Sequence, residues 1–236
     1  MSTRDSLQDI FEAVPPHYDL INHIFTFGLD NKWREKIAKI CLTFQPEMVL
    51  DLCCGTGELT IDLADLSKGK LTIIGLDYSK PMIDKAVGKT KLYSRSSKID
   101  FVEGDASKLP FSDNSFDCVV IAFAFRNLTY RSKLALPHVT EVIRVLKKGG
   151  RYIIVESSQP GPRIIRFTYK LYLRYFVYWL GYLISGNKSA YNYLANSAAN
   201  YFAPREINNM LTNAGFSSVL QIPLFLGATC IHIAQK

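Results

Sequence analysis

The sequence predicts an α/β fold whose sheet is doubly wound, mainly parallel and finished by an antiparallel hairpin. From residue 48 onward, apolar runs bounded by turn residues alternate with helix-like segments, which is the rhythm of a βαβ protein. Most of these runs are continuously apolar, as in strands that helices cover on both faces. The last two runs, at residues 217–226 and 229–234, are separated by a turn at Gly227 and must therefore pair antiparallel.

Five strands are expected in the first two thirds of the chain, at residues 48–54, 71–77, 99–105, 116–124 and 151–157. Helices are expected between them at residues 58–66 and 79–87 and in a segment that ends with residues 139–147. Ser79 followed by Pro81 is typical of a helix start, and Gly149 with Gly150 of a helix stop. Pro137 should begin or kink the third helix, because proline disrupts a helix interior.

The chain is expected to form one domain with four parts: a helical cap (1–44), a core (45–158), a second helical segment (159–200), and a C-terminal helix and hairpin (201–236). The 48% of hydrophobic residues exclude a disordered chain. No run reaches the ~20 apolar residues of a membrane-spanning helix. The N-terminal residues do not resemble a secretory signal, and the five cysteines lack zinc-ligand spacing. We therefore expect free thiols, no metal and a cytoplasmic location.

The net charge of +7 is concentrated in one segment, because residues 151–188 carry six basic and one acidic side chain. Four of the basic residues, Arg163, Arg166, Lys170 and Arg174, fall within an arc of roughly 80° on a helix. The rest of that helix is apolar and rich in tyrosine and tryptophan, which favours the surface of an anionic membrane. The alternative is a helix that is buried against the sheet and exposes one charged face.

A glycine turn follows the first predicted strand, in the stretch DLCCGTGE at residues 51–58. Gly55 and Gly57 allow the backbone to turn sharply and let a nucleoside come into contact with it, which a Cβ atom would block. Thr60 stands where a dinucleotide site would have its third glycine. The turn therefore argues against NAD and FAD.

Aspartates end the next two predicted strands. Asp77 lies about 20 residues after Gly57, where a carboxylate can accept both hydroxyls of a ribose. Asp105, with Ala106 after it, can accept from an adenine amino group. Either aspartate alone could be a helix cap or a loop residue. A nucleoside site is indicated because the glycine turn and both aspartates occur at successive strand ends.

Together these features resemble the class I S-adenosylmethionine-dependent methyltransferases, whose Rossmann-like, seven-stranded sheet ends in such a hairpin. The resemblance implies that S-adenosyl-L-methionine is the cofactor and that the core binds it. Residues 55–57 would receive the methionine part, Asp77 the ribose, and Asp105 with Ala106 the adenine. The expected cofactor-binding residues are Asp51, Gly55, Thr56, Gly57, Asp77, Tyr78, Asp105, Ala106 and Ala122.

Two longer stretches resemble the ubiquinone/menaquinone biosynthesis C-methyltransferases. Residues 18–33 (YDLINHIFTFGLDNKW) are similar to their N-terminal signature, and residues 144–158 contain the RVLKKGG and ESS of their second signature. The similarity covers nearly the whole chain, although Asp30 and Lys148 replace the usual histidine and proline. The resemblance implies C-methylation of a polyprenyl benzoquinol or naphthoquinol by an enzyme peripheral to the inner face of the cell membrane. These departures leave the quinone head group open.

Methyl transfer to a ring carbon is helped by deprotonation of a ring hydroxyl, so the protein must align the ring, stabilise a phenolate and accept a proton. Arg126, just after the fourth strand, can stabilise an oxyanion, and Asn127 can hydrogen-bond a ring oxygen. The resemblance implies that Arg126, Asn127 and Tyr18 are the substrate-activating residues. The alternative for Arg126 is a surface salt bridge. Tyr18, His17, His23 and a water molecule are all left as candidate proton acceptors.

Other functions leave different patterns in a sequence. Enzymes that methylate nucleobase amines have an Asp/Asn-Pro-Pro-aromatic stretch where this chain has AFAF at residues 122–125, so no nucleic acid is expected as a partner. Cys118 lies inside a predicted strand and is better explained by core packing than as a nucleophile. Two alternatives are left open: methylation of another membrane-embedded molecule, such as a sterol, tocopherol precursor or phospholipid, and a non-catalytic S-adenosylmethionine-binding scaffold. A homodimer is also left open.

Overall fold

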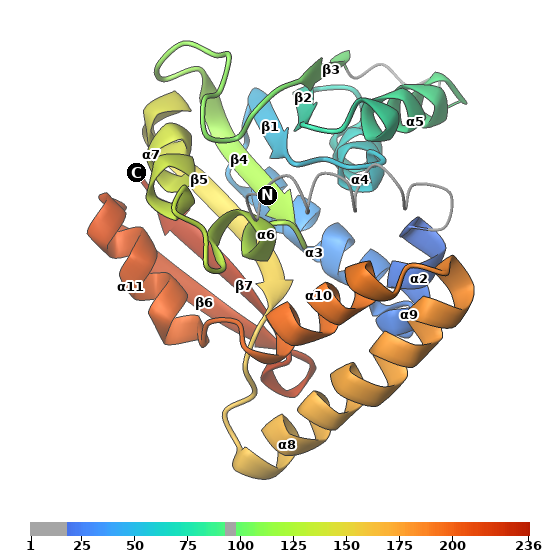
Figure 1. The fold of residues 1–236 in the computed structure, drawn as a ribbon. Helices are drawn as coiled ribbons and strands as arrows, with labels where there is room; N and C mark the ends of the chain where they lie inside the picture. Colours follow the sequence, from blue (N-terminus) through green and yellow to red (C-terminus); the bar gives the residue numbers. More distant parts are fainter. Residues whose placement is uncertain (1–17, 93–97) are drawn as a thin grey trace.

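A computed structural model describes residues 18–92 and 98–236, which form one seven-stranded sheet in the order β3-β2-β1-β4-β5-β7-β6 (Figure 1). The strands are β1 (Met48–Leu52), β2 (Thr72–Asp77), β3 (Lys98–Glu103), β4 (Phe116–Ala122), β5 (Leu146–Ser157), β6 (Ser218–Leu224) and β7 (Thr229–Gln235). Strands β1 to β5 pair in parallel, whereas β7 runs antiparallel to both β5 and β6. The predicted doubly wound sheet with a C-terminal hairpin is confirmed.

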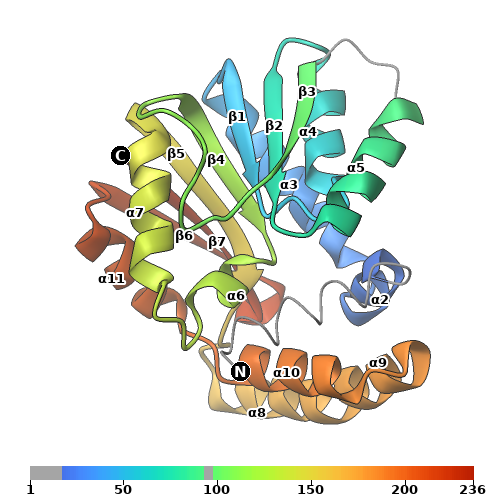
Figure 2. The ribbon, with the colours of Figure 1, turned by 45° about the horizontal axis from the view of Figure 1, so that its top comes forward.

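Helices cover both faces of this sheet (Figures 1 and 2). They are α2 (Tyr18–Phe25), α3 (Leu29–Thr43), α4 (Glu58–Ser67), α5 (Lys80–Leu92), α6 (Phe125–Thr129), α7 (Ala135–Val145), α8 (Arg163–Leu171), α9 (Tyr178–Ser185), α10 (Lys188–Ala199) and α11 (Pro204–Ala214), with the π-helix η1 (Tyr172–Val177) and the 3-10 turn η2 (Phe225–Gly227). On β1, Val49 packs with α3 and α4, and Leu50 packs with α7 and α11. Neighbouring side chains of a strand point to opposite faces, so this apolar strand supplies both halves of the core.

Helices α8, η1, α9 and α10 form a separate layer beyond the C-terminal ends of the parallel strands (Figure 2). Gly181 lets α9 approach α10 closely, because a Cβ atom there would lie 2.1 Å from the Tyr191 ring. The buried Tyr191 packs edge-on against Phe25 of α2, with 5.8 Å between the ring centroids. No residue of α8 is buried. The alternative of a helix buried against the sheet is therefore wrong for α8.

Several predicted boundaries differ from the structure. Strands β1 and β4 each end two residues early, because Cys53 (φ 56°) and Phe123 (φ 58°) adopt left-handed conformations that end the extended chain. The third helix ends at Val145 rather than at residue 147, because Leu146 already pairs with β4. Pro137 lies in the first turn of α7, where its missing N–H breaks no helical hydrogen bond. The predicted helix start near this proline is confirmed.

All five cysteines have free thiols, as expected. Cys41, Cys118 and Cys230 are buried, whereas Cys53 and Cys54 lie half-buried in the turn after β1 and not within the strand. Within residues 18–92 and 98–236, no cluster of histidine, cysteine and carboxylate side chains could hold a metal ion. None of the helices in these ranges combines the length and apolarity needed to cross a membrane.

Candidate functional site

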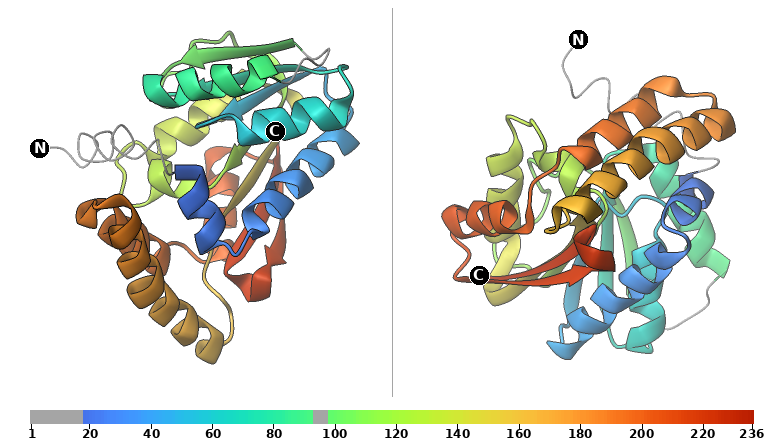
Figure 3. Two further views of the ribbon diagram at one scale, coloured as in Figure 1. Left: turned by 90° about the vertical axis from the view of Figure 1, so that its right-hand side faces the viewer. Right: turned by 90° about the horizontal axis from the view of Figure 1, so that it is seen from below.

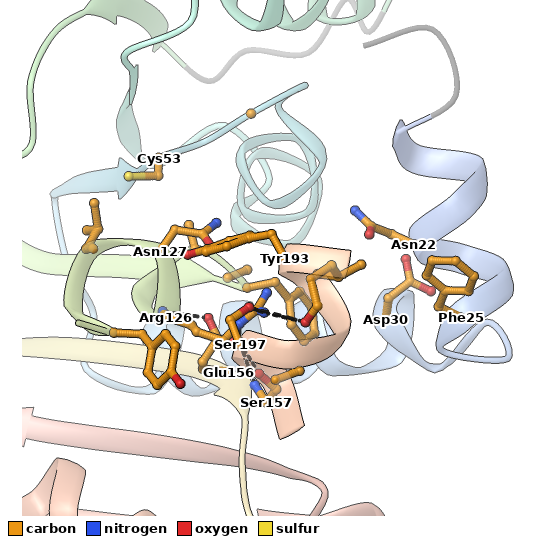
Figure 4. A pocket seen from close by; sticks show the side chains of 18 of the residues that line it. Asn22, Phe25, Asp30, Cys53, Arg126, Asn127, Glu156, Ser157, Tyr193 and Ser197 are labelled. Carbon is orange, nitrogen blue, oxygen red and sulfur yellow. Dashed lines mark hydrogen bonds and ion pairs between the residues drawn. The ribbon is translucent and has the colours of Figure 1, made fainter. Parts of the chain in front are cut away.

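A cavity of about 1600 Å³ lies beyond the C-terminal ends of the parallel strands, between the sheet edge, the cap helices and α10 (Figure 4). The strand order reverses between β1 and β4, and such switch points are where α/β sheets bind their ligands. Eight predicted cofactor-binding residues line this cavity: Asp51, Gly55, Thr56, Asp77, Tyr78, Asp105, Ala106 and Ala122. Arg126 and Asn127 line it as well. The fold thus brings residues from separate strand ends into one site.

The two glycines of the turn after β1 have different roles. Gly55 (φ 55°) borders the cavity, and a Cβ atom placed there would meet nothing within 4 Å. Gly57 (φ 82°) instead faces α5, where a Cβ atom would lie 3.0 Å from the Cβ of Ala86. Gly57 does not line the cavity. Its predicted ligand contact is thus replaced by a packing role that lets α4 begin close to α5.

Asp77 fastens the glycine turn to the end of β2. The Gly55 N–H donates to Oδ2 of Asp77 at 2.8 Å, and the Ser79 N–H donates to Oδ1 at 2.9 Å. Burial raises the pKa of the Asp77 carboxyl, although these backbone N–H groups oppose the shift. The carboxylate is therefore held in a fixed orientation at the cavity wall, next to the exposed Tyr78.

Asp51 is a deeply buried carboxylate of the site, with 1% of its surface exposed. The Thr60 hydroxyl donates to its Oδ2 at 2.6 Å. Burial raises the pKa of Asp51 to about 7, and the nearby charge of Asp77 adds to this effect, while the hydrogen bond from Thr60 opposes it. Thr60, which occupies the place of a third glycine, is thus the partner that orients Asp51.

The far wall carries the residues predicted to recognise adenine. Asp105 accepts the Ser107 N–H at 2.8 Å, so the chain folds back on itself directly after β3. Ala106 is buried beside it, and Ala122 lies at the end of β4. Asp105, Ala106 and Ala122 all border the cavity, whereas Ser107 does not. This wall is small and apolar apart from the Asp105 carboxylate.

A polar latch joins the cap helix α2 to the glycine turn. The Thr56 hydroxyl donates to Oδ1 of Asp19 at 2.7 Å, and Nζ of Lys89 donates to Oδ2 of Asp19 at 2.8 Å and to Thr56 Oγ1 at 2.9 Å. Lys89 also pairs with Glu58. Burial lowers the pKa of Lys89, but the bonds to Asp19 and Glu58 outweigh it and leave the pKa raised. Sequence reasoning missed Asp19, although it stands inside the N-terminal signature.

Arg126 is buried in α6, with 4% of its surface exposed, and does not form the surface salt bridge considered as its alternative. Its guanidinium lies beside the carboxylate of Glu156, with 3.7 Å between Nε and Oε1. Nη1 donates to the Leu194 carbonyl at 3.2 Å and to the Ser197 hydroxyl, both on α10 (Figure 4). Arg126 therefore connects the sheet edge to α10.

Glu156 is the second residue that sequence reasoning did not identify. It is 1% exposed at the end of β5, where it accepts the Arg126 N–H at 2.9 Å and the N–H and hydroxyl of Ser157, each at 2.7 Å. The available signal was a lone carboxylate at the end of the apolar strand RYIIVES. A charge in such a place needs a partner of opposite charge, since an isolated buried charge is strongly unfavourable.

Four residues that line the cavity carry a buried polar atom without a hydrogen-bond partner among the described residues: Arg34 (Nε), Ser79 (Oγ), Arg126 (Nε) and Asn127 (Oδ1). Arg126 Nε, a donor, and Asn127 Oδ1, an acceptor, belong to neighbouring residues. Both are buried, and Figure 4 shows the two side chains extending into the same cavity together with Tyr193. Burial raises the pKa of Tyr193, although the charge of Arg126 and a hydrogen bond with Ser197 oppose the shift. A ligand that both donates and accepts would satisfy this adjacent pair.

The candidate groups of the cap are only partly described. His17 lies outside the described residues, and Tyr18 opens α2 with a side chain that is likewise outside the description. Nδ1 of His23 lies 3.1 Å from Oδ1 of Asp30, which also accepts from Thr26. Burial alone would raise the pKa of Asp30, but its bonds to Thr26 and to a neighbouring arginine hold that pKa below its usual value. His23 is therefore engaged with the cap rather than with Arg126.

A family model described as the ubiE/COQ5 methyltransferase family matches residues 1–236. A demethylmenaquinone methyltransferase from Thermotoga maritima is 38% identical over 239 residues, covering 99% of this chain and 97% of that protein. A protein of the same name from Lactobacillus johnsonii is 36% identical over 230 residues, covering 98% and 92% respectively.

Solved structures show the same fold at low sequence identity. A SAM-dependent methyltransferase from Thermotoga maritima, titled as a possible histamine N-methyltransferase, has a TM-score of 0.61 at 20% identity, covering 97% of this chain and 99% of that one. An O-methyltransferase family protein from Burkholderia thailandensis has a TM-score of 0.66 at 14% identity, covering 92% and 58% respectively.

The raised pKa of Asp51 predicts how the stability of the protein depends on pH. A carboxyl group whose pKa is raised by folding stabilises the protein fully below its unfolded pKa, and this contribution is lost as the pH rises through the folded pKa of about 7. Asp51→Asn should therefore gain free energy of unfolding relative to the parent as the pH rises from about 4 to about 7, by at most about 1.4 kcal/mol per pH unit. Urea denaturation at several pH values measures the difference. A difference that does not change with pH would contradict the shift.

Proposed function

The chain belongs to the ubiE/COQ5 methyltransferase family, and on that premise we propose that it methylates a ring carbon of a polyprenyl naphthoquinol. It is an S-adenosylmethionine-dependent C-methyltransferase. The relatives named demethylmenaquinone methyltransferase favour a naphthoquinol over a benzoquinol. The observation that carries the proposal is the adjacent pair of unsatisfied polar atoms on Arg126 and Asn127, set in the cavity that also holds the glycine turn.

The residues at the sheet edge fit the cofactor. The open space at Gly55 admits the methionine part, since a side chain there would project into the cavity. The Asp77 carboxylate, already oriented by two N–H groups, has remaining lone pairs for the ribose hydroxyls. Asp105 and Ala106 form the wall for adenine. S-adenosylmethionine, when bound, supplies an electrophilic methyl group on a sulfonium ion.

The cavity has apolar walls that suit the substrate. Phe25 and Tyr172 contribute aromatic walls from the cap and from η1, and Leu173 and Val177 contribute aliphatic ones. A fused aromatic ring would bury its faces against such walls. The Asn127 acceptor can take a hydrogen bond from one ring hydroxyl, and the Arg126 donor can give one to an oxygen that has lost its proton.

The ring becomes nucleophilic at carbon when its hydroxyl oxygen carries negative charge. Arg126 holds a permanent positive charge in a buried site, where it stabilises a developing phenolate more than it would in water. Glu156 balances this charge in the absence of substrate and prevents Arg126 from turning away. Because α10 is hydrogen-bonded to Arg126, this helix, which covers the cavity, and the guanidinium charge are positioned together.

The proposal places the enzyme at the inner face of the cell membrane, where a polyprenyl substrate resides. Residues 157–205 contain six basic side chains and no acidic one. Arg163, Lys170 and Arg174 are exposed, as the predicted basic stripe requires. Arg166 departs from it, because its Nε donates to the Pro160 carbonyl at 2.8 Å and holds the linker before α8. Three of the four predicted charges can thus face anionic headgroups.

The proposed ribose contact is tested by Asp77→Ala. Loss of a charge-assisted hydrogen bond should weaken binding of S-adenosylhomocysteine, the demethylated cofactor, by about 1.5 to 3 kcal/mol in calorimetry. Asp84→Ala, which removes an exposed carboxylate of α5, is the matched control and should leave affinity as in the parent. Equal affinity of the Asp77 variant and the parent would rule out the ribose assignment.

The function itself is tested by incubating the protein with S-adenosylmethionine and a short-chain demethylnaphthoquinol, and by identifying the methylated ring carbon in the product. Asn127→Ala should lower this rate by roughly 100-fold, the order seen when one polar group of an oxyanion site is removed. The free energy of unfolding should stay equal or rise, because an unsatisfied buried oxygen is removed. Asn209→Ala, on the exposed side of α11, is the control.

Asn127 is a better target than Arg126, because removing Arg126 would leave the Glu156 charge buried without its partner. If Asn127→Ala keeps the parental rate, Asn127 does not contact the ring. If instead the benzoquinol is methylated and the naphthoquinol is not, the proposed head group is wrong while the reaction class stands.

The membrane proposal is tested by changing Arg163, Lys170 and Arg174 together to Gln. Each charge should contribute about 1 kcal/mol to binding of anionic vesicles, so the variant should be released in co-sedimentation at moderate salt. Changing Lys36, Lys68 and Lys70 to Gln alters the net charge equally on other exposed surfaces and should have little effect. Equal release of both triple variants would mean that net charge, and not the α8 segment, governs binding.

A further inference from the structure

The turn between β6 and β7 combines two energetically unfavourable features: a strained backbone and exposed apolar side chains. Phe225, Leu226 and Gly227 have φ angles of 42°, 56° and 88°, so two large non-glycine residues are held in the left-handed region. Their side chains are nevertheless exposed, Phe225 by 53% and Leu226 by 70%. Strained backbone that presents apolar side chains to solvent is typical of a functional surface rather than of a simple connection.

This turn lies at the mouth of the cavity. Phe225 and Leu226 both line it, and the Phe225 ring lies 6.3 Å from that of Trp33, which in turn lies 6.0 Å from Phe123 after β4. Both views in Figure 3 show the turn beside the start of α8. Consistent with this, a Cβ atom on Gly227 would lie 3.4 Å from Cα of Pro160 in the linker to that helix. The mouth is thus framed by elements far apart in the sequence.

Exposed apolar side chains continue from the turn along α8. Ile164, Phe167 and Leu171 are exposed by 79%, 63% and 39%, and they follow one another at helical spacing. Each stands one position after a basic residue of the predicted stripe, so the apolar row runs next to the basic one. Phe27, which also lines the cavity, is 65% exposed, and its ring stacks on that of Phe176.

The charges around this surface indicate which kind of partner it can bind. Residues 217–235, which include the whole hairpin, carry no Asp, Glu, Lys or Arg, and the α8 to α10 segment carries basic charges only. An apolar centre bordered by basic side chains is complementary to a bilayer with anionic headgroups, where the apolar groups enter the acyl region and the charges stay at the surface. A second copy of the chain would bring like charges together.

We propose that the Phe225–Leu226 turn is a wedge that inserts into the bilayer and opens the cavity mouth directly to its acyl region. The polyprenyl tail of the substrate then passes from lipid into the cavity past Phe225, Leu226 and Phe27 without crossing water. This inference rests on the proposed function for the identity of the tail, but the insertion of the turn does not. The polar part of the site remains inside the cavity, at Arg126 and Asn127.

Insertion is measured by placing a tryptophan at the turn and quenching its fluorescence with lipids brominated in their acyl chains. Phe225→Trp should be quenched more strongly than the parent in anionic vesicles. Phe44→Trp is the matched control: Phe44 is also exposed, but it stands just before β1, at the opposite end of the strands, and should match the parent. Equal quenching of the two variants would overturn the proposal.

The consequence for the substrate is measured with Phe225→Asn and Leu226→Asn combined, since asparagine tolerates a left-handed backbone. Vesicle binding should weaken about tenfold or more, and activity should fall at least about tenfold further on a vesicle-borne, long-chain quinol than on a short-chain quinol in detergent. Leu220→Asn, which changes an exposed leucine within β6, should show neither effect.

The outcomes separate the two proposals. If the protein methylates no quinol but the Phe225 tryptophan is quenched, the wedge stands and the proposed function fails. If methylation is normal and the double variant keeps parental binding and parental preference for the long-chain substrate, the wedge fails and the function stands. If the double variant changes the sedimentation coefficient of the parent in the absence of lipid, the turn is an interface between copies and the wedge is overturned.

Discussion

The ion pair between Arg126 and Glu156 links the three layers of the molecule. Glu156 ends β5, Arg126 belongs to the short helix after β4, and Nη1 of Arg126 donates to the Leu194 carbonyl of α10. Two buried charges are tolerated only when each finds its partner and further hydrogen bonds, and here both conditions are met for Glu156. The position of α10 over the sheet edge, and with it the shape of the cavity, therefore depends on this pair.

Two of the strands that lead to the site end in a residue with a left-handed conformation. Cys53 after β1 and Phe123 after β4 end their strands in this way, and the residues that follow them turn toward the cavity. Such conformations cost roughly 1 to 2 kcal/mol for a residue with a side chain. The packed sheet behind them can sustain that cost, since its central strands are buried on both faces. The rigid core thus allows an irregular backbone at the C-terminal ends of the strands, where the residues of the candidate site lie.

The helical layer beyond the sheet differs from the core in how it distributes apolar side chains. Within it, Leu173 and Val177 of η1 pack with Tyr191 of α10, whereas Ile164 and Phe167 of α8 lie in solvent. Large apolar side chains are unfavourable on a surface that faces water, but they are favourable on a surface that contacts lipid. The side of this layer that faces the sheet forms one wall of the cavity. A single helical insertion between β5 and the hairpin can therefore line the cavity and also form the surface that we propose to meet the bilayer.

The sequence by itself determined the fold class and most of the cavity wall that we propose for the cofactor. Continuous apolar runs have a strong strand signal, and Asp77 and Asp105 follow such runs directly, so their convergence at one sheet edge follows from parallel topology. Only the tertiary structure decided the partners of the remaining polar groups. The pairing of Arg126 with Glu156 joins residues 30 positions apart, and that of Asp19 with Thr56 joins residues 37 apart. Local patterns carry no information on such distant contacts, and the strained turn at Phe225 and Leu226 was likewise invisible, because its conformation is imposed by the strands that it connects.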